Sequence, residues 1–221
     1  MSNKDANLKE KLKQALESTF KVISDDFKID LNSKQNKKNN KIDFFELDKL
    51  NTKSDFIKAR AETDSSALKK KFSNDDIFKK NLPSNSSCKS LYSIAEKIRC
   101  ESLGGKMLKG IQKNFTENYS QIIHSKRKDH LKTREDVPVN EAFELYMLKK
   151  CHDIELNTVT KKMLNFWEKD FDKSITSHIK FLKDNLENQN EYSTKFSEIL
   201  QNMDIFQTED NEEGKEENKD D

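Results

Sequence analysis

Glycine, proline and cysteine are all scarce in this 221-residue sequence, which contains four, two and three of them respectively. β-Sandwiches, barrels and glycine-rich nucleotide folds need many tight turns, and Gly and Pro supply most turn positions. Their scarcity argues against these three classes and favours an all-helical chain.

The three cysteines are Cys88, Cys100 and Cys151. Their odd number and wide spacing give neither a C-x-x-C pair nor a disulfide framework.

Long hydrophobic runs are also missing. No apolar stretch approaches the roughly 18 residues of a membrane span, and the N-terminus lacks the apolar core of a signal peptide. We therefore expect a cytoplasmic protein.

Mean hydropathy is −1.00 and 37% of residues are charged, yet the formal net charge is only +1. Low hydrophobicity with balanced charge does not by itself predict disorder.

The apolar residues of the sequence follow mainly a helical period. Apolar residues at spacings of three and four predict amphipathic helices over residues 7–24 and 54–73, and several more between 137 and 205. The longest periodic segment, about 86–124, predicts one long central helix interrupted by Gly104-Gly105. Two glycines within a helix predict either a kink or the close approach of another backbone. The fold class expected is mainly α, a multi-helix bundle.

The period changes near residues 27–47, where apolar and polar residues alternate on both sides of a polar tract at 32–41. Alternation of this kind predicts a small β-hairpin with a long mobile loop. The alternative is an unstructured linker. Residues 1–207 are expected to form one helical domain that includes this hairpin.

The last fourteen residues, 208–221, contain eight acids and two lysines, a net charge of −6. The remainder of the chain therefore carries +7. A short acidic run without apolar residues predicts a disordered linker or tail.

Motifs that would specify an autonomous enzyme are absent. No Walker A loop, G-x-G-x-x-G or G-x-S-x-G sequence occurs. Residues 172–176 match the D-x-S-x-[ST] metal motif, but a helical pattern precedes them where that motif needs a strand, so we interpret the match as chance. The consecutive residues Cys151, His152 and Asp153 point about 100° apart on a helix, and we interpret them as ordinary residues rather than metal ligands.

Basic clusters at 69–71 and 126–128 would permit contacts to nucleic-acid phosphates. Only four of the 41 basic residues are arginine, however, and no nucleic-acid-binding module is recognisable. We interpret the clusters as solvated helical surface rather than as a nucleic-acid-binding site.

Several short stretches, in order between residues 10 and 205, resemble a known family. They are Leu12-Lys13-Gln14-Ala15, Lys58-Ala59-Arg60-Ala61-Glu62 with Ala67-Leu68-Lys69, Ala95 to Gly104 (AEKIRCESLG), Thr133 to Val139 (TREDVPV), and Leu164-Asn165-Phe166-Trp167. Together they resemble the N-terminal region of the cobaltochelatase CobT subunit of aerobic cobalamin synthesis. The family is Arg-rich at places where this chain has Lys, and Gly105 stands where Ala is common.

The resemblance implies a part in ATP-dependent insertion of Co²⁺ into a corrin ring, hydrogenobyrinic acid a,c-diamide. It implies two partners, an AAA+ ATPase subunit and a large tetrapyrrole-binding subunit, with homo-oligomerisation within the complex. The complex would use ATP, Mg²⁺ and Co²⁺, whereas this chain would bind no cofactor and would not be catalytic alone. The C-terminal von Willebrand A-like domain of the family, with its D-x-S-x-S metal site, is expected to be missing.

The family resemblance transfers no catalytic, cofactor-binding or metal-binding residue to this sequence. As candidate interface residues, expected to be exposed, we single out Arg60, Arg99, Glu101, Arg134 and Asp136. The alternative for each is an intramolecular role, such as pairing with a neighbouring helix or, for Asp136, capping. The alternative function is a generic helical protein-interaction or nucleic-acid-binding protein.

Overall fold

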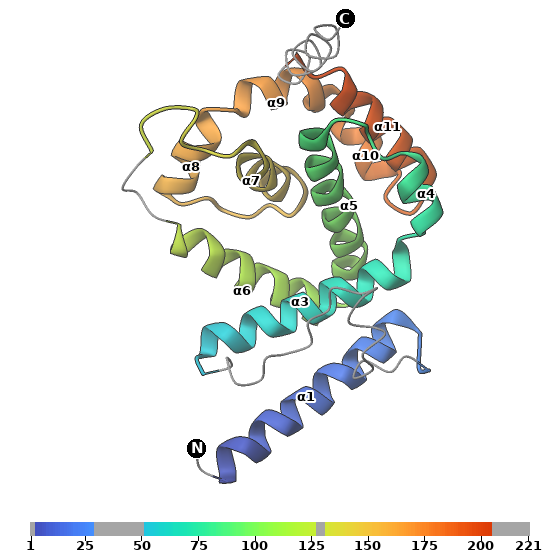
Figure 1. The fold of residues 1–221 in the computed structure, drawn as a ribbon, viewed down its shortest axis with the longest axis vertical. Coiled ribbons are helices and arrows are strands. Elements are labelled where there is room, and N and C mark those ends of the chain that lie inside the picture. Colours follow the sequence, from blue (N-terminus) through green and yellow to red (C-terminus); the bar gives the residue numbers. More distant parts are fainter. Residues whose placement is uncertain (1–2, 29–50, 127–130, 205–221) are drawn as a thin grey trace, which may run out of the picture.

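The structure, a computed structural model, describes residues 3–28, 51–126 and 131–204. These residues form a mainly helical fold, as predicted (Figure 1). The helices are α1 (Asn3–Ser24), α3 (Lys53–Phe72), α4 (Asp75–Lys80), α5 (Ser86–Met107), α6 (Lys109–Ser125), α7 (Val139–Cys151), α8 (Thr158–Asn165), α9 (Glu168–Ile175), α10 (Ile179–Asp184) and α11 (Gln189–Gln201), with a 3₁₀ turn at Thr176–His178.

The predicted β-hairpin at 27–47 is not supported. Most of that segment lies outside the described residues; Phe27 and Lys28, which are described, lie in a turn. No strand occurs in the ranges that the structure covers. Alternation over only a few apolar residues was too short a signal to establish a strand.

Polar side chains begin many of the helices. Thr52 and Asp55 form a capping box at the start of α3, in which each side chain binds the other's backbone N–H. Asn74, Asn85, Asn157 and Asn188 cap α4, α5, α8 and α11 by accepting hydrogen bonds from backbone N–H groups of the first turn. The abundant asparagines thus help to fix where helices start.

The predicted long central helix is wrong, because the segment forms two helices. Leu108 has an extended backbone (φ −139°, ψ 114°) and separates α5 from α6. A Cβ on Gly104 would lie 2.3 Å from Cδ1 of Leu68 on α3, so glycine lets α3 approach this closely. The close contact at Gly104 is thus with the Leu68 side chain rather than with another backbone, and the break in the helix follows the glycine pair at Leu108.

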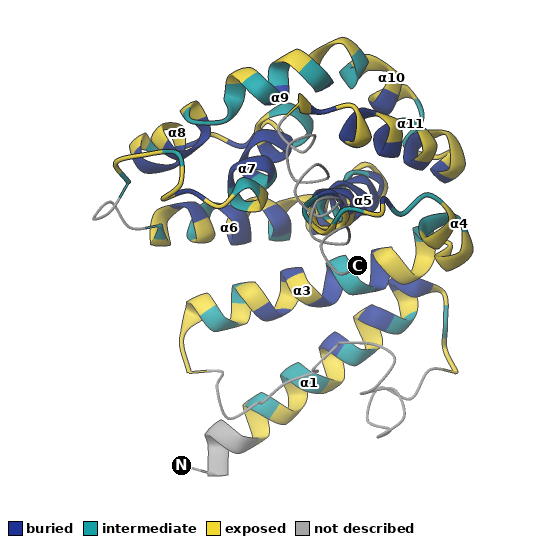
Figure 2. Cartoon of the chain, turned by 45° about the horizontal axis from the view of Figure 1, so that its top comes forward, coloured by how far each residue is buried: buried dark blue, intermediate teal, exposed yellow. Residues whose placement is uncertain are grey.

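Helix α5 forms the centre of the core. It packs against α3, α6, α7 and α11, and Figure 2 shows α5 and α7 largely buried, whereas α1 and α3 have exposed outer faces. The main cluster includes Leu91, Ile98, Phe143, Phe171 and Phe196. Helix α1 lies along α3 at one edge of the fold, where Leu16 and Ala59 form a separate small cluster.

Candidate functional site

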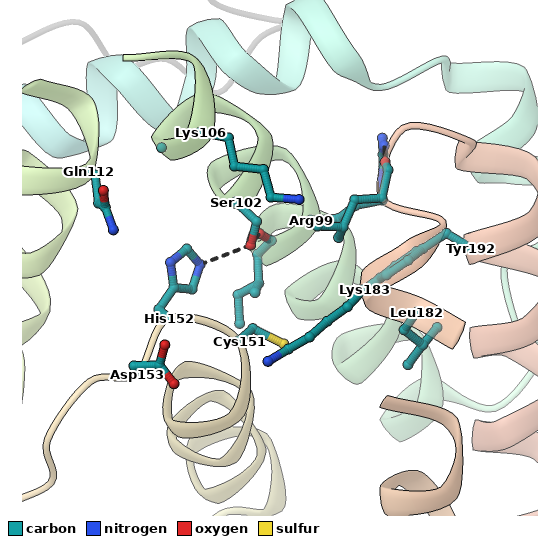
Figure 3. Close-up of a pocket in the computed structure, with 13 residues that line it drawn as sticks. Arg99, Ser102, Lys106, Gln112, Cys151, His152, Asp153, Leu182, Lys183 and Tyr192 are labelled. Atoms are coloured by element: carbon teal, nitrogen blue, oxygen red, sulfur yellow. Dashed lines mark hydrogen bonds between the residues drawn. The ribbon is translucent and has the colours of Figure 1, made fainter. Parts of the chain in front are cut away.

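A pocket of about 310 Å³ lies where the C-terminal parts of α5 and α7 approach α10 (Figure 3). One wall consists of α5 residues, among them Ser102 and Lys106, and the opposite wall includes Leu182 and Lys183 of α10. The end of α7 supplies three consecutive residues, which are Cys151, His152 and Asp153. The pocket is therefore assembled from segments that are about 80 residues apart in the chain.

The chain changes direction at the end of α7, and this turn places all three residues at the pocket. The His152 N–H donates to the Leu148 carbonyl at 3.0 Å and closes the last helical turn. Asp153 then adopts a left-handed backbone with φ 52°, a conformation that Asp tolerates better than most residues. On a continuous helix, consecutive side chains point about 100° apart. Because α7 ends at Cys151, this angle does not apply to His152 and Asp153.

Burial keeps the thiol and the imidazole of this pocket uncharged near neutral pH. It raises the pKa of Cys151 to about 11 and lowers the pKa of His152, an effect that a hydrogen bond to the Ile98 backbone partly opposes. The His152 Nε2 lies 3.4 Å from the Ser102 Oγ, and that hydroxyl donates to the Ile98 carbonyl at 2.8 Å. The charged groups lining the pocket are therefore Arg99, Lys106, Lys183 and Asp153.

The partly buried position of His152 predicts a pH dependence of stability. Its pKa in the folded state lies below the value of about 6.5 expected for the unfolded chain, so the unfolded state binds the proton more readily. His152 should therefore lower the free energy of unfolding as pH falls through about 6.5. Urea unfolding at pH 7.5 and 5.5 should show a smaller loss of stability on acidification for His152→Gln than for the unmodified chain.

The matched control is His178→Gln, because His178 lies outside the pocket. An acid sensitivity of His152→Gln equal to or larger than that of the unmodified chain would contradict the proposed contribution of the partly buried imidazole.

Arg99, which was expected to be exposed, is 1% exposed and lies in the core. Its Nε donates to Glu96 at 2.8 Å, and its two terminal nitrogens donate to the carbonyls of Leu186 and Phe72 at 2.7 and 2.6 Å. Gln189 of α11 also binds the Glu96 carboxylate, at 3.0 Å. This ion pair therefore joins α5 to the end of α3 and to the segment that leads into α11.

The expected exposure of Glu101 is also wrong, because this side chain is 1% exposed. Its two carboxylate oxygens accept hydrogen bonds from the Tyr119 and Ser65 hydroxyls, each at 2.6 Å. Burial raises the pKa of Glu101, and the nearby Lys97 ammonium opposes this rise. The residue links α5 to α6 and α3.

The other three candidate interface residues lie at the surface in different places. Arg60 is exposed on α3. Arg134 is partly exposed, lies 3.8 Å above the Trp167 ring and pairs with Asp170 at 2.9 Å. The exposed Asp136 accepts the backbone N–H groups of Lys132 and Thr133 at 2.9 and 2.8 Å. The structure therefore does not bring the five candidates together into one surface.

The D-x-S-x-[ST] match lies on α9 and the turn after it, and its acidic residue has protein partners. Asp172 accepts hydrogen bonds from the Tyr146 and Thr176 hydroxyls, each at 2.9 Å, and pairs with Lys150 at 3.1 Å. Among the described residues, no group of three or more His, Cys, Asp or Glu side chains is placed to hold a metal ion.

Sequence reasoning did not identify Ser102, Lys106, His152 or Lys183 as neighbours. The Gly104-Gly105 pair did predict close packing at this end of α5, and Cys151-His152-Asp153 was considered as a cluster. No local pattern connects either segment to Lys183, because that proximity depends on how α10 folds back onto α5.

No helix in the described ranges has both the length and the apolar content needed to cross a membrane. The described residues define a mainly helical protein whose helices are joined by buried polar networks. The family model described as "Cobalamin biosynthesis protein CobT" matches residues 6–221, so the chain belongs to the CobT family. The resemblance seen in the sequence is thereby confirmed. No curated protein and no solved structure was found to match.

The family gives the chain a role in cobalamin biosynthesis, in which CobT is a chelatase subunit that works in a complex. This places the chain in a pathway but assigns no residue a function.

Proposed function

We propose that this chain is the assembly and coupling subunit of an ATP-dependent cobaltochelatase that inserts Co²⁺ into hydrogenobyrinic acid a,c-diamide. In this proposal the chain binds an AAA+ ATPase subunit and transmits its ATP-driven motion to a large tetrapyrrole-binding subunit. Co²⁺ and the corrin ring are the substrates, and ATP with Mg²⁺ drives the reaction. Residues 1–207 act as the helical domain, and residues 208–221 as an acidic linker.

The observation that carries the proposal is the family match over residues 6–221. The way the helices are joined also suits a coupling role. The Arg99–Glu96 pair and the Glu101 hydrogen bonds connect α3, α5, α6 and the start of α11. A body whose helices are cross-linked by buried charges can transmit a displacement as a unit, because packed cores do not deform continuously.

Co-purification with the ATPase subunit tests the proposal. The full chain is expected to be retained by the tagged AAA+ ATPase subunit of the same organism, with more retained in the presence of ATP and Mg²⁺ than without nucleotide. Absence of retention under both conditions would overturn the assembly role.

A charge reversal on α3 tests Arg60, one of the candidate interface residues that are exposed. Arg60→Glu is expected to weaken retention about tenfold, the effect of losing one favourable charged contact of roughly 1.4 kcal/mol. Lys80→Glu on α4 is the matched control, because it changes net charge equally at another exposed site. If both variants weaken retention equally, the loss comes from the change in net charge and not from a specific contact of Arg60.

A further inference from the structure

The proposed assembly role does not use the pocket at the end of α7. Its volume of about 310 Å³ equals about ten water molecules at their share of liquid volume, roughly 30 Å³ each. It lies at the lower end of the range for small-molecule sites, about 300–1,000 Å³. A compact ligand would fit.

Two lysines give the pocket an excess of positive charge. Neither Lys106 nor Lys183 forms a hydrogen bond or an ion pair with another described residue. Figure 3 shows the Lys106 chain extending toward Arg99 and the Lys183 chain extending toward Cys151. Asp153 is the one carboxylate that lines the pocket.

Arg99 contributes little to this excess, because its positive charge is already compensated. Glu96 accepts from its Nε and one terminal nitrogen, at 2.8 and 2.9 Å, and the Leu186 and Phe72 carbonyls each accept from one of its terminal nitrogens. The Cys151 thiol and the His152 imidazole are neutral, as derived above. Lys106 and Lys183 are therefore the cations available to a ligand.

The remaining lining is suited to an apolar body with one polar end. Leu182, Leu186 and the Tyr192 ring form an apolar wall beside Lys183. The Tyr192 hydroxyl already donates to the Ala95 carbonyl at 3.3 Å, so this residue offers its ring rather than its polar atom. Gln112 and Ser102 lie on the other side and add neutral hydrogen-bonding groups.

We propose that this pocket binds a small organic carboxylate, which is attracted by the positive charges of Lys106 and Lys183 and has its short apolar body against Leu182, Leu186 and Tyr192. Ion pairing supplies the preference for an anion, and burial of the apolar body supplies the preference for an organic one. The proposal concerns this chain alone and does not depend on its role in a chelatase.

The test compares hexanoate with hexanamide, which has nearly the same shape but no charge. Each is titrated into the full chain, and binding is followed by the amide chemical shifts of Ser102, Gly105 and His152. Hexanoate is expected to shift these amides with an affinity about tenfold or more above that of hexanamide, as expected for a charge-assisted contact of roughly 1.5 kcal/mol or more.

Lysine variants test which positive charge contributes to hexanoate binding. Lys106→Met and Lys183→Met are each expected to weaken hexanoate binding about five- to tenfold and to leave hexanamide binding unchanged. Lys180→Met is the matched control, because Lys180 is exposed on the same helix as Lys183 but does not line the pocket. It is expected to leave both affinities unchanged. Thermal unfolding of each variant verifies that it remains folded.

Three results would overturn the proposal. They are equal affinities for hexanoate and hexanamide, hexanoate-induced shifts confined to residues outside the pocket, and hexanoate binding that neither lysine variant weakens. Tighter binding of inorganic phosphate than of hexanoate would also overturn the assignment to a carboxylate.

Discussion

Arg99→Met is expected to lower the free energy of unfolding by about 3–5 kcal/mol, the usual cost of removing one partner of a buried ion pair. The substitution leaves the Glu96 carboxylate, which is 2% exposed, without its cation. It also leaves the Phe72 and Leu186 carbonyls without the donors that reach them in the native fold. Methionine fills much of the volume, so the loss reflects charge and hydrogen bonding more than an empty cavity.

Urea unfolding followed by circular dichroism measures this loss. The matched control is Arg60→Met, an exposed arginine for which a change within about 0.5 kcal/mol is expected. Similar losses in the two variants would contradict the structural role of Arg99. The double variant Arg99→Met/Glu96→Leu should recover part of the stability, because it removes the stranded carboxylate. Recovery should be incomplete, since Gln189 and Ser73 then lose a partner.

Gly104→Ala is expected to destabilise the protein by about 1–2 kcal/mol, although alanine is the better helix former by about 1 kcal/mol. The added Cβ would lie 2.3 and 2.5 Å from the two terminal carbons of Leu68. Leu68 is 0% exposed and has little space in which to move, so relief of the clash must shift α3 or α5. Overpacking of this kind typically costs about 1–3 kcal/mol, which exceeds the gain in helix propensity.

The neighbouring glycine provides the control. A Cβ on Gly105 would lie 3.5 Å from the Gln112 Cβ, an ordinary contact, so Gly105→Ala should stabilise by up to about 1 kcal/mol. Thermal unfolding of the two variants should therefore give shifts of opposite sign. Gly104→Ala should also cost less in a Leu68→Ala background, where the clash is removed. A stabilising Gly104→Ala would show that α3 and α5 are not held this closely.

The helical class could be predicted because its evidence is local. The scarcity of Gly and Pro and the periodic apolar residues both act within one or two helical turns, and they indicated helices where α1, α3 and α11 occur. The break at Leu108 was harder to locate, since it follows the glycine pair by three residues and depends on how α3 and α6 pack around it.

The positions of Arg99 and Glu101 could not be predicted from the same kind of pattern. Their neighbours Ala95, Ile98 and Leu103 already provide a buried stripe, which suggests that the charged residues between them face solvent. Helix α5 instead packs against neighbours on several sides, so its polar stripe is buried as well. A sequence does not distinguish a solvated charge from one whose partner is 93 residues away, as Gln189 is from Glu96.

The stretches that resemble the CobT family turn out to contact one another. Leu68 packs on Gly104, Arg134 lies above Trp167, and the Trp167 Nε1 donates to the Val137 carbonyl at 3.0 Å. Leu16, just after the first stretch, packs on Ala59 of the second. These residues therefore stabilise the contacts between helices, and most of them do not line the pocket.

The attachment of α1 is uneven along its length, and this has a consequence for how the molecule opens. Phe20 and Ile23 near its C-terminal end join the main cluster, whereas Leu12 and Leu16 nearer its start contact only the small cluster with Ala59. Amide protons in the first half of α1 should consequently exchange with solvent through a local opening that costs much less than global unfolding. The first half of α1 can open away from α3 while the rest of the described fold stays intact, so this half is more readily exchanged for a different neighbour than the C-terminal half.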